Sequence, residues 1–146
     1  MSLLTPEHVL LASTARSKRA LITELAKTLS SMDLDQVMEV VMAREQLGST
    51  GIGHGVAIPH GRLPELSQPV VAIARHSAGV DFDAIDGQPV HIIIMLLVPE
   101  DASRQHLELL AYLARIFQQE HLRQAVMNAE SIDDILQLFP DLTQSG

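Results

Sequence analysis

The sequence lacks cysteine and tryptophan, and only 3% of its 146 residues are aromatic. The lack of cysteine excludes disulfide bonds, thiolate metal centres, iron–sulfur clusters and cysteine nucleophiles. The small number of aromatic side chains leaves few platforms on which bases or sugar rings could stack. Hydrophobic residues nevertheless make up 47% of the chain, so it can bury a core without covalent cross-links.

Basic residues are in the minority, because 10 Lys and Arg stand against 18 Asp and Glu and the formal net charge is −8. Such a charge repels phosphate backbones and anionic lipids, so we expect no nucleic-acid partner. Residues 1–7 lack the basic and apolar regions of a signal peptide. The longest apolar run, residues 92–98, is far shorter than the roughly 20 residues that span a bilayer. We therefore expect no membrane insertion and a cytoplasmic location.

The length of the chain, 146 residues, is that of one domain. The sequence contains no internal repeat, low-complexity tract or long linker, so it predicts a single domain over residues 1–146. Ser17 is expected to cap a first helix. Asp33 is expected to cap a second helix, with Gln36 completing a capping box, and Gly48 should end it. No oligomeric state is predicted.

Three β-prone stretches follow, at residues 56–58, 70–75 and 91–98. The last is unbroken in its apolar character, which is typical of a strand buried on both faces. A long helix with an apolar stripe is predicted to begin at an N-cap on Ser103, and two short helices should finish the chain, the last capped by Ser131. The pattern indicates an α/β (α+β) fold in which a small mixed β-sheet is flanked by helices on both faces.

The glycine-rich stretch before the first strand does not match a nucleotide-binding motif. A P-loop needs a lysine and a hydroxyl residue where the sequence has His54-Gly55, and the alternating glycines do not fit G-x-G-x-x-G. If the chain between His54 and His60 is extended, their rings are about 20 Å apart, so one metal ion could bind both only at a sharp reversal. A serine hydrolase would need the G-x-S-x-G turn, which is absent. We predict no cofactor and no metal.

Two histidines stand out for their surroundings. His60 follows Pro59, which stiffens the backbone, and precedes Gly61, which lets another element approach closely. Its imidazole, with a reference pKa near 6.5, is largely neutral and nucleophilic at pH 7, although it could also be a plain loop histidine. His106 falls in the first turn of the long helix, where a neutral ring and a bound anion are favoured; alternatively, it is a core histidine with a satisfied hydrogen bond.

Residues 44–61, REQLGSTGIGHGVAIPHG, resemble the phosphorylation-site signature of fructose/mannitol-type enzyme IIA domains of the bacterial phosphoenolpyruvate-dependent phosphotransferase system. Glu45 matches its acidic or amide position, Ile52-Gly53 its aliphatic-glycine pair, and residues 56–61 its aliphatic-Ala-aliphatic-Pro-His-small block. Residues 82–90 and His106-Leu107 are similar to later blocks of the family, most of all in its nitrogen-regulatory branch. Family members often carry Asn where this chain has His54.

The resemblance implies that His60 accepts a phosphoryl group at Nε2 from an HPr/NPr-like phosphocarrier. It also implies that His106 donates a hydrogen bond to that group or orients His60, and that Arg44 neutralises phosphoryl charge, although Arg44 could instead form a surface pair with an acidic neighbour. We expect the docking face for the partner to include Ile52, Val56 and Leu63.

Three functions compete. The first is a phosphorylation-dependent regulator of the nitrogen type that acts on a target protein. The second is a sugar-transport enzyme IIA that passes the phosphoryl group to a fructose/mannitol-type enzyme IIB. The third is a small-ligand binding module with structural histidines, which predicts a ligand-dependent shift in melting temperature and no acid-labile phosphate.

Overall fold

The computed structural model describes residues 3–101 and 103–143. Within them a six-stranded sheet has the order β1-β5-β6-β3-β2, with β4 also paired to β6. The strands are β1 (Val9–Leu10), β2 (Gly51–Gly53), β3 (Val56–Ala57), β4 (His60–Leu63), β5 (Val70–Val80) and β6 (Val90–Pro99). The helices are η1 (Pro6–His8), α1 (Lys18–Ala26), α2 (Leu34–Leu47), α3 (Ser103–Ile116), α4 (Glu120–Asn128), α5 (Ile132–Gln137) and α6 (Pro140–Thr143). None of the described helices is long and apolar enough to cross a bilayer.

The sheet is mixed, as predicted. β5 and β6 are antiparallel, whereas β1 is parallel to β5 and both β3 and β4 are parallel to β6. β3 and β4 follow one another along the same edge of β6, because Val56 pairs with Ile92 and His60 pairs with Leu96. The two short strands therefore act as one strand along β6, interrupted at residues 58 and 59.

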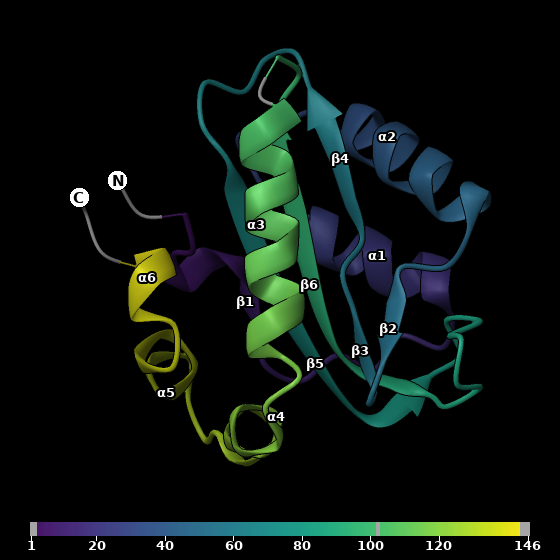
Figure 1. Cartoon of the computed structure of the whole chain (residues 1–146), viewed down its shortest axis with the longest axis vertical. Coiled ribbons are helices and arrows are strands. Elements are labelled where there is room, and N and C mark those ends of the chain that lie inside the picture. Colours follow the sequence, from purple (N-terminus) through teal and green to yellow (C-terminus); the bar gives the residue numbers. More distant parts are fainter. Residues whose placement is uncertain (1–2, 102, 144–146) are drawn as a thin grey trace.

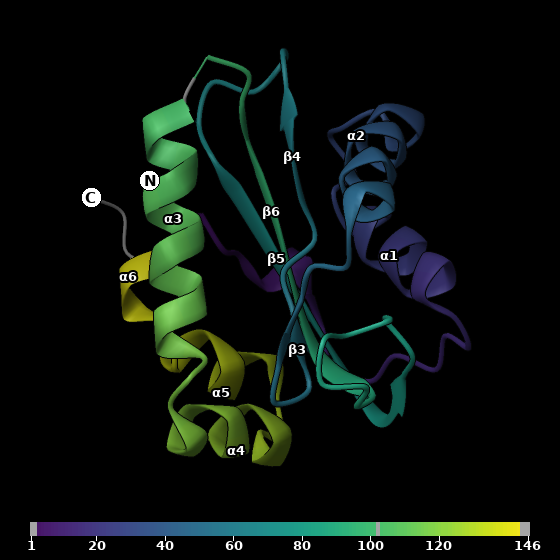
Figure 2. The same ribbon diagram turned by 45° about the vertical axis from the view of Figure 1, so that its right-hand side comes forward.

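Helices cover both faces of the sheet, which confirms the predicted architecture. α1 and α2 lie on one face, and α3 lies on the other with α4, α5 and α6 (Figures 1 and 2). Side chains along β6 alternate between the two cores. Those on the α3 side are Ile92, Ile94, Leu96 and Val98, and those on the α1–α2 side are Ile93, Met95 and Leu97. Because successive side chains of β6 enter opposite cores and both cores are apolar, the apolar run of this strand has to be unbroken.

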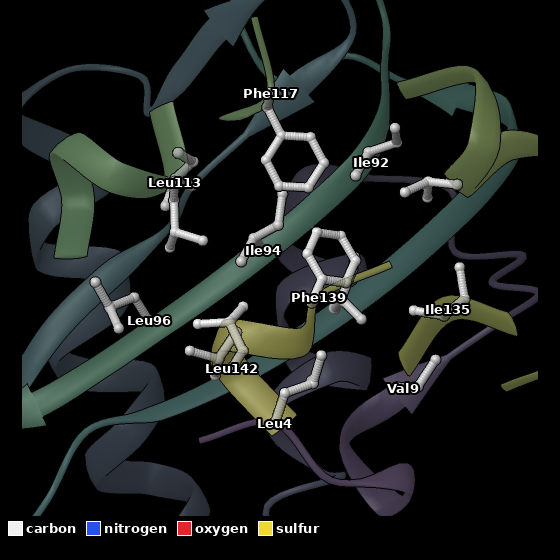
Figure 3. Close-up of a cluster of buried hydrophobic side chains, with 14 of the residues drawn as sticks. Leu4, Val9, Ile92, Ile94, Leu96, Leu113, Phe117, Ile135, Phe139 and Leu142 are labelled. Atoms are coloured by element: carbon white, nitrogen blue, oxygen red, sulfur yellow. The ribbon is translucent and has the colours of Figure 1, made fainter. Parts of the chain in front are cut away.

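The core on the α3 side gathers the C-terminal helices against the sheet. Figure 3 shows Phe117 and Phe139 among aliphatic side chains that include Leu113 and Ile94. The two phenyl rings have centroids 5.7 Å apart. Full burial of each large apolar side chain contributes about 1.5–3 kcal/mol, so this cluster fixes α3 on the sheet.

The predicted N-caps are confirmed at three helices, although no bond from the Gln36 side chain back to the Asp33 N–H completes the predicted capping box among the described residues. Ser17 accepts a hydrogen bond from the backbone N–H of Ala20, Asp33 from that of Gln36, and Ser131 from that of Asp134. The prediction of two short C-terminal helices was wrong, because the described residues contain a third, α6. The predicted cap on Ser103 lies outside the described part of the chain, since its side chain and residue 102 are not described.

Candidate active site

His60 is the first residue of β4, not a loop residue. Ile58 and Pro59 interrupt the strand before it, and the carbonyl of Pro59 accepts a hydrogen bond from the N–H of Leu96 at 3.0 Å. Because His60 pairs with Leu96, its half-buried side chain lies on the α3 side of the sheet. Pairing with β6 therefore determines where the imidazole points.

Gly61 allows the close approach that the sequence predicts. A Cβ atom on this residue would lie 2.8 Å from Cγ2 and 3.3 Å from the backbone carbon of Val40. The backbone of α2 consequently packs directly on β4, which brings the C-terminal end of this helix toward His60.

The hydrogen bond of the His60 ring determines which nitrogen is free. Nδ1 lies 2.8 Å from the carbonyl oxygen of Ile58, and a carbonyl can only accept, so we assign the proton to Nδ1. Burial lowers the pKa of His60 below its ordinary value and Arg44 acts in the same direction, against the hydrogen bond to Ile58 and the charge of Glu45. The neutral ring thus carries its lone pair on Nε2.

His106 lies edge-on to His60, with ring centroids 5.1 Å apart and an interplanar angle of 87°. It is only 7% exposed, and its Nδ1 has no hydrogen-bond partner among the described residues. The alternative of a core histidine with a satisfied hydrogen bond is therefore wrong for Nδ1. Burial lowers the pKa of His106 to about 4, with contributions from His60 and Arg62. The ring is neutral as predicted, although burial rather than the helix terminus is the leading cause.

Two guanidinium groups accompany the histidines. Arg44, in the last turn of α2, donates from Nη1 to the carbonyl of Gly48 at 2.8 Å, and its charge acts on His60. The alternative of a surface pair with an acidic neighbour is not observed, since no ion pair of Arg44 occurs among the described residues. Arg62 is exposed and lies two residues beyond His60 in β4, on the same face, and its charge acts on His106.

Arg62 was missed by the sequence analysis. The sequence did not predict a strand at residues 60–63. Once these residues are placed in β4, the alternation of side chains along a strand puts Arg62 on the same face as His60. Among the described residues Arg62 forms no hydrogen bond or ion pair. Its charge is thus available to an anion beside the two rings.

The expected docking face needs correction. Val56 and Leu63 are buried in the cores and cannot contact a partner. Exposed apolar side chains are instead provided by Leu47 and Leu107, at 84% and 66% exposure, together with Ile52. Leu47 follows Arg44 by one helical turn at the end of α2, and Leu107 follows His106 directly in α3.

His54 stands apart from His60. It occupies a left-handed turn with φ of 58° between β2 and β3, where its backbone N–H donates to Asp86 at 3.2 Å. The structure brings no group of three potential metal ligands together among its described residues. The arrangement of His60 and His106, with two arginine charges nearby, is suited to receiving an anionic group on a neutral imidazole.

Comparison with known proteins identifies the family of the chain. Residues 2–141 match the family model described as phosphoenolpyruvate-dependent sugar phosphotransferase system, EIIA 2. The chain therefore belongs to this family, and it is a phosphocarrier component of the phosphotransferase system. The resemblance based on the signature is confirmed.

Individual relatives point to the nitrogen-regulatory branch. The chain is 38% identical over 148 residues to the nitrogen regulatory protein of Pseudomonas aeruginosa, covering 99% of this chain and 96% of that protein. The crystal structure of nitrogen regulatory protein IIA-Ntr from Neisseria meningitidis superposes with a TM-score of 0.88 at 42% identity, covering 93% of this chain and 95% of that one. A fructose-specific EIIABC component from Bacillus subtilis is 34% identical over 141 residues, which are 94% of this chain and 22% of that protein.

Proposed function

We propose that the chain accepts a phosphoryl group on Nε2 of His60 from a phosphohistidine on an HPr/NPr-like carrier. The observation that carries the proposal is the 2.8 Å hydrogen bond between His60 Nδ1 and the carbonyl of Ile58, which leaves the Nε2 lone pair free. The lowered pKa of His60 supports it, because the neutral ring is the nucleophile.

In this transfer the Nε2 lone pair forms a bond to phosphorus while the bond from phosphorus to the carrier's imidazole nitrogen breaks, and that nitrogen keeps the electron pair. The Nδ1 proton of His60 stays hydrogen-bonded to Ile58, so no proton has to leave the attacking nitrogen. The phosphoryl oxygens carry the negative charge, which Arg44 and Arg62 offset.

His106 completes the proposed site as a hydrogen-bond donor. Its neutral ring has one N–H group, which would donate to a phosphoryl oxygen or hold the His60 ring in place. Support comes from its buried Nδ1, which has no partner among the described residues, and from the edge-on contact of the two rings. A buried polar atom without a partner is rare in a folded protein and calls for an explanation such as ligand binding.

The proposed role is regulatory. Phosphorylation adds roughly two negative charges to a surface whose helices α2 and α3 also carry the exposed Leu47 and Leu107, which changes how a target protein binds without refolding the domain. The name of the Pseudomonas aeruginosa relative supports this role. In this proposal residues 1–146 act as one domain, in the cytoplasm, with the phosphocarrier and a regulatory target as partners.

The second candidate is transfer of the phosphoryl group to a fructose/mannitol-type enzyme IIB. It is favoured by the identity of 34% to the Bacillus subtilis fructose-specific component. Mixing the phosphorylated chain with such an enzyme IIB discriminates the two roles, because a transport protein hands on its phosphoryl group rapidly and a regulator retains it.

The proposal is tested by intact-mass measurement after exposure to phosphoenolpyruvate and the complete phosphotransferase cascade. The wild type should gain one acid-labile phosphoryl group, and His60→Ala should gain none. His121→Ala, which removes an exposed histidine in α4, is the matched control and should behave as the wild type. Full labelling of His60→Ala would refute the assignment.

A further inference from the structure

A buried carboxylate lies at the junction of α1, α2 and β2. The Glu45 side chain is 1% exposed, and its Oε2 lies 2.6 Å from Nζ of Lys18. Thr50, directly before β2, donates its hydroxyl to Oε1 and its backbone N–H to Oε2 of the same carboxylate. Charge-assisted bonds of this kind are stronger than neutral ones, so Thr50 is held firmly.

The contacts continue from Thr50 to the candidate nucleophile. The carbonyl of Thr50 accepts a hydrogen bond from the N–H of Ile58 at 3.0 Å, and the carbonyl of Ile58 accepts one from Nδ1 of His60 at 2.8 Å. Pro59 has no N–H group to donate, and its carbonyl accepts a hydrogen bond from the N–H of Leu96 in β6 at 3.0 Å. The Ile58 carbonyl therefore lies between two fixed points, the bond of Ile58 to Thr50 on one side and the bond of Pro59 to β6 on the other.

We propose that Glu45 is a positioning residue for His60: by fixing Thr50 it fixes Ile58, whose carbonyl selects the tautomer that leaves Nε2 free. Glu45 does not touch the reacting atoms in this proposal. The inference rests on the proposed function, in which Nε2 is the atom that attacks phosphorus.

Because Glu45 and Thr50 are buried, an effect of these residues on the position of His60 can be distinguished from an effect on partner binding. Glu45 and Thr50 are both 5% exposed, so neither can contact the carrier protein. Loss of the Thr50 hydroxyl should consequently lower kcat for phosphoryl transfer and leave KM unchanged. A displacement of about 1 Å at a reacting group can slow a reaction by up to 10²-fold, and we expect about a tenfold loss here.

Thr50→Val keeps the shape of the side chain and removes its hydroxyl, whereas Thr50→Ser restores the hydroxyl. We expect Thr50→Val to lower kcat about tenfold with KM within about twofold, and Thr50→Ser to recover most of kcat. Long-range ¹H–¹⁵N NMR of the imidazole should show the wild-type ring protonated at Nδ1 and a mixture of tautomers in Thr50→Val. Glu45→Gln, which keeps the size and loses the charge, should change both measurements in the same direction.

Ser13→Ala is the matched control. It removes a comparable hydroxyl–carboxylate bond, from Ser13 to Glu24, which no hydrogen bond among the described residues links to His60. This variant should lose stability with unchanged kcat and an unchanged tautomer.

Folded Thr50→Val with wild-type kcat and a wild-type tautomer would overturn the proposal. If Thr50→Val does not fold, the same result in Glu45→Gln would overturn it. Failure of the proposed function is recognised separately, because the wild type itself would then take no phosphoryl group on His60.

Discussion

Replacing Gly61 with Ala introduces a methyl group where α2 rests on β4. The new Cβ would meet Cγ2 of Val40 at 2.8 Å, its Cβ at 3.1 Å and its backbone carbon at 3.3 Å. A rotation of the valine cannot move the backbone atom, so the helix itself must shift. Overpacking of this kind costs about 1–3 kcal/mol. Because Gly61 does not have a positive φ, alanine can adopt the same backbone conformation. Alanine also restricts the unfolded chain, which raises the unfolding free energy by about 0.4–1 kcal/mol and offsets part of this loss. The expected net loss of unfolding free energy is about 1–2 kcal/mol.

A double-mutant cycle with Val40→Ala isolates this contact. Val40→Ala removes the atom that lies 2.8 Å from the added Cβ, and because Val40 is half-buried the single change should cost about 1 kcal/mol. Gly61→Ala should be less harmful in this background, with a coupling of about 1 kcal/mol measured by urea denaturation. Since α2 carries Arg44, Gly61→Ala should also slow phosphorylation, and the double variant should recover. Wild-type stability in Gly61→Ala, or strictly additive effects, would refute the proposed packing.

Three further predictions concern pH, backbone strain and charge. The pKa of His106 is lowered to about 4 in the folded protein, so the unfolded chain binds the proton more readily, and the unfolding free energy should fall as the pH drops from about 6.5 to 4. In urea titrations across that range, His106→Gln should lose less stability than the wild type. The same pH dependence in both proteins would contradict this prediction. His54 has φ of 58°, a conformation that Asn adopts more readily, so His54→Asn should raise the unfolding free energy by roughly 0.5 kcal/mol in thermal melts. Arg62→Gln should slow phosphoryl transfer about tenfold by removing one charge from the phosphoryl group, whereas Arg104→Gln, which loses only an exposed ion pair with Glu108, should not; equal rates for the two variants would count against Arg62.

The elements that the sequence predicted well are those whose signals are local. Helix caps at Ser17, Asp33 and Ser131 each depend on a hydrogen bond to a backbone N–H three residues away, and the apolar run of β6 is unbroken over its length. A pattern in neighbouring residues is sufficient to recognise both.

The elements that escaped prediction depend on contacts between distant residues. β4 has only four residues, and it is a strand because His60 to Leu63 pair with β6 more than thirty positions away. For the same reason the sequence placed Val56 and Leu63 on a docking face, whereas both lie in the cores. The proximity of His60 and His106 was predicted from the family resemblance alone, and it arises from the packing of α3 on the sheet.

The role of Glu45 shows the same limit. The signature marks this position as acidic or amide, but nothing in the sequence connects it with Lys18 on α1 or with the carbonyl of Ile58. Those connections exist only after α1, α2 and β2 have packed together.

The most direct test of the proposed chemistry is an NMR spectrum of the phosphorylated chain carrying ¹⁵N-labelled histidine. A one-bond coupling between ³¹P and ¹⁵N identifies both the residue and the nitrogen that holds the phosphoryl group. We expect a single coupling, to Nε2 of His60, with Nδ1 still protonated toward Ile58. A coupling to Nδ1 of His60, or to any other histidine, would contradict the proposed function.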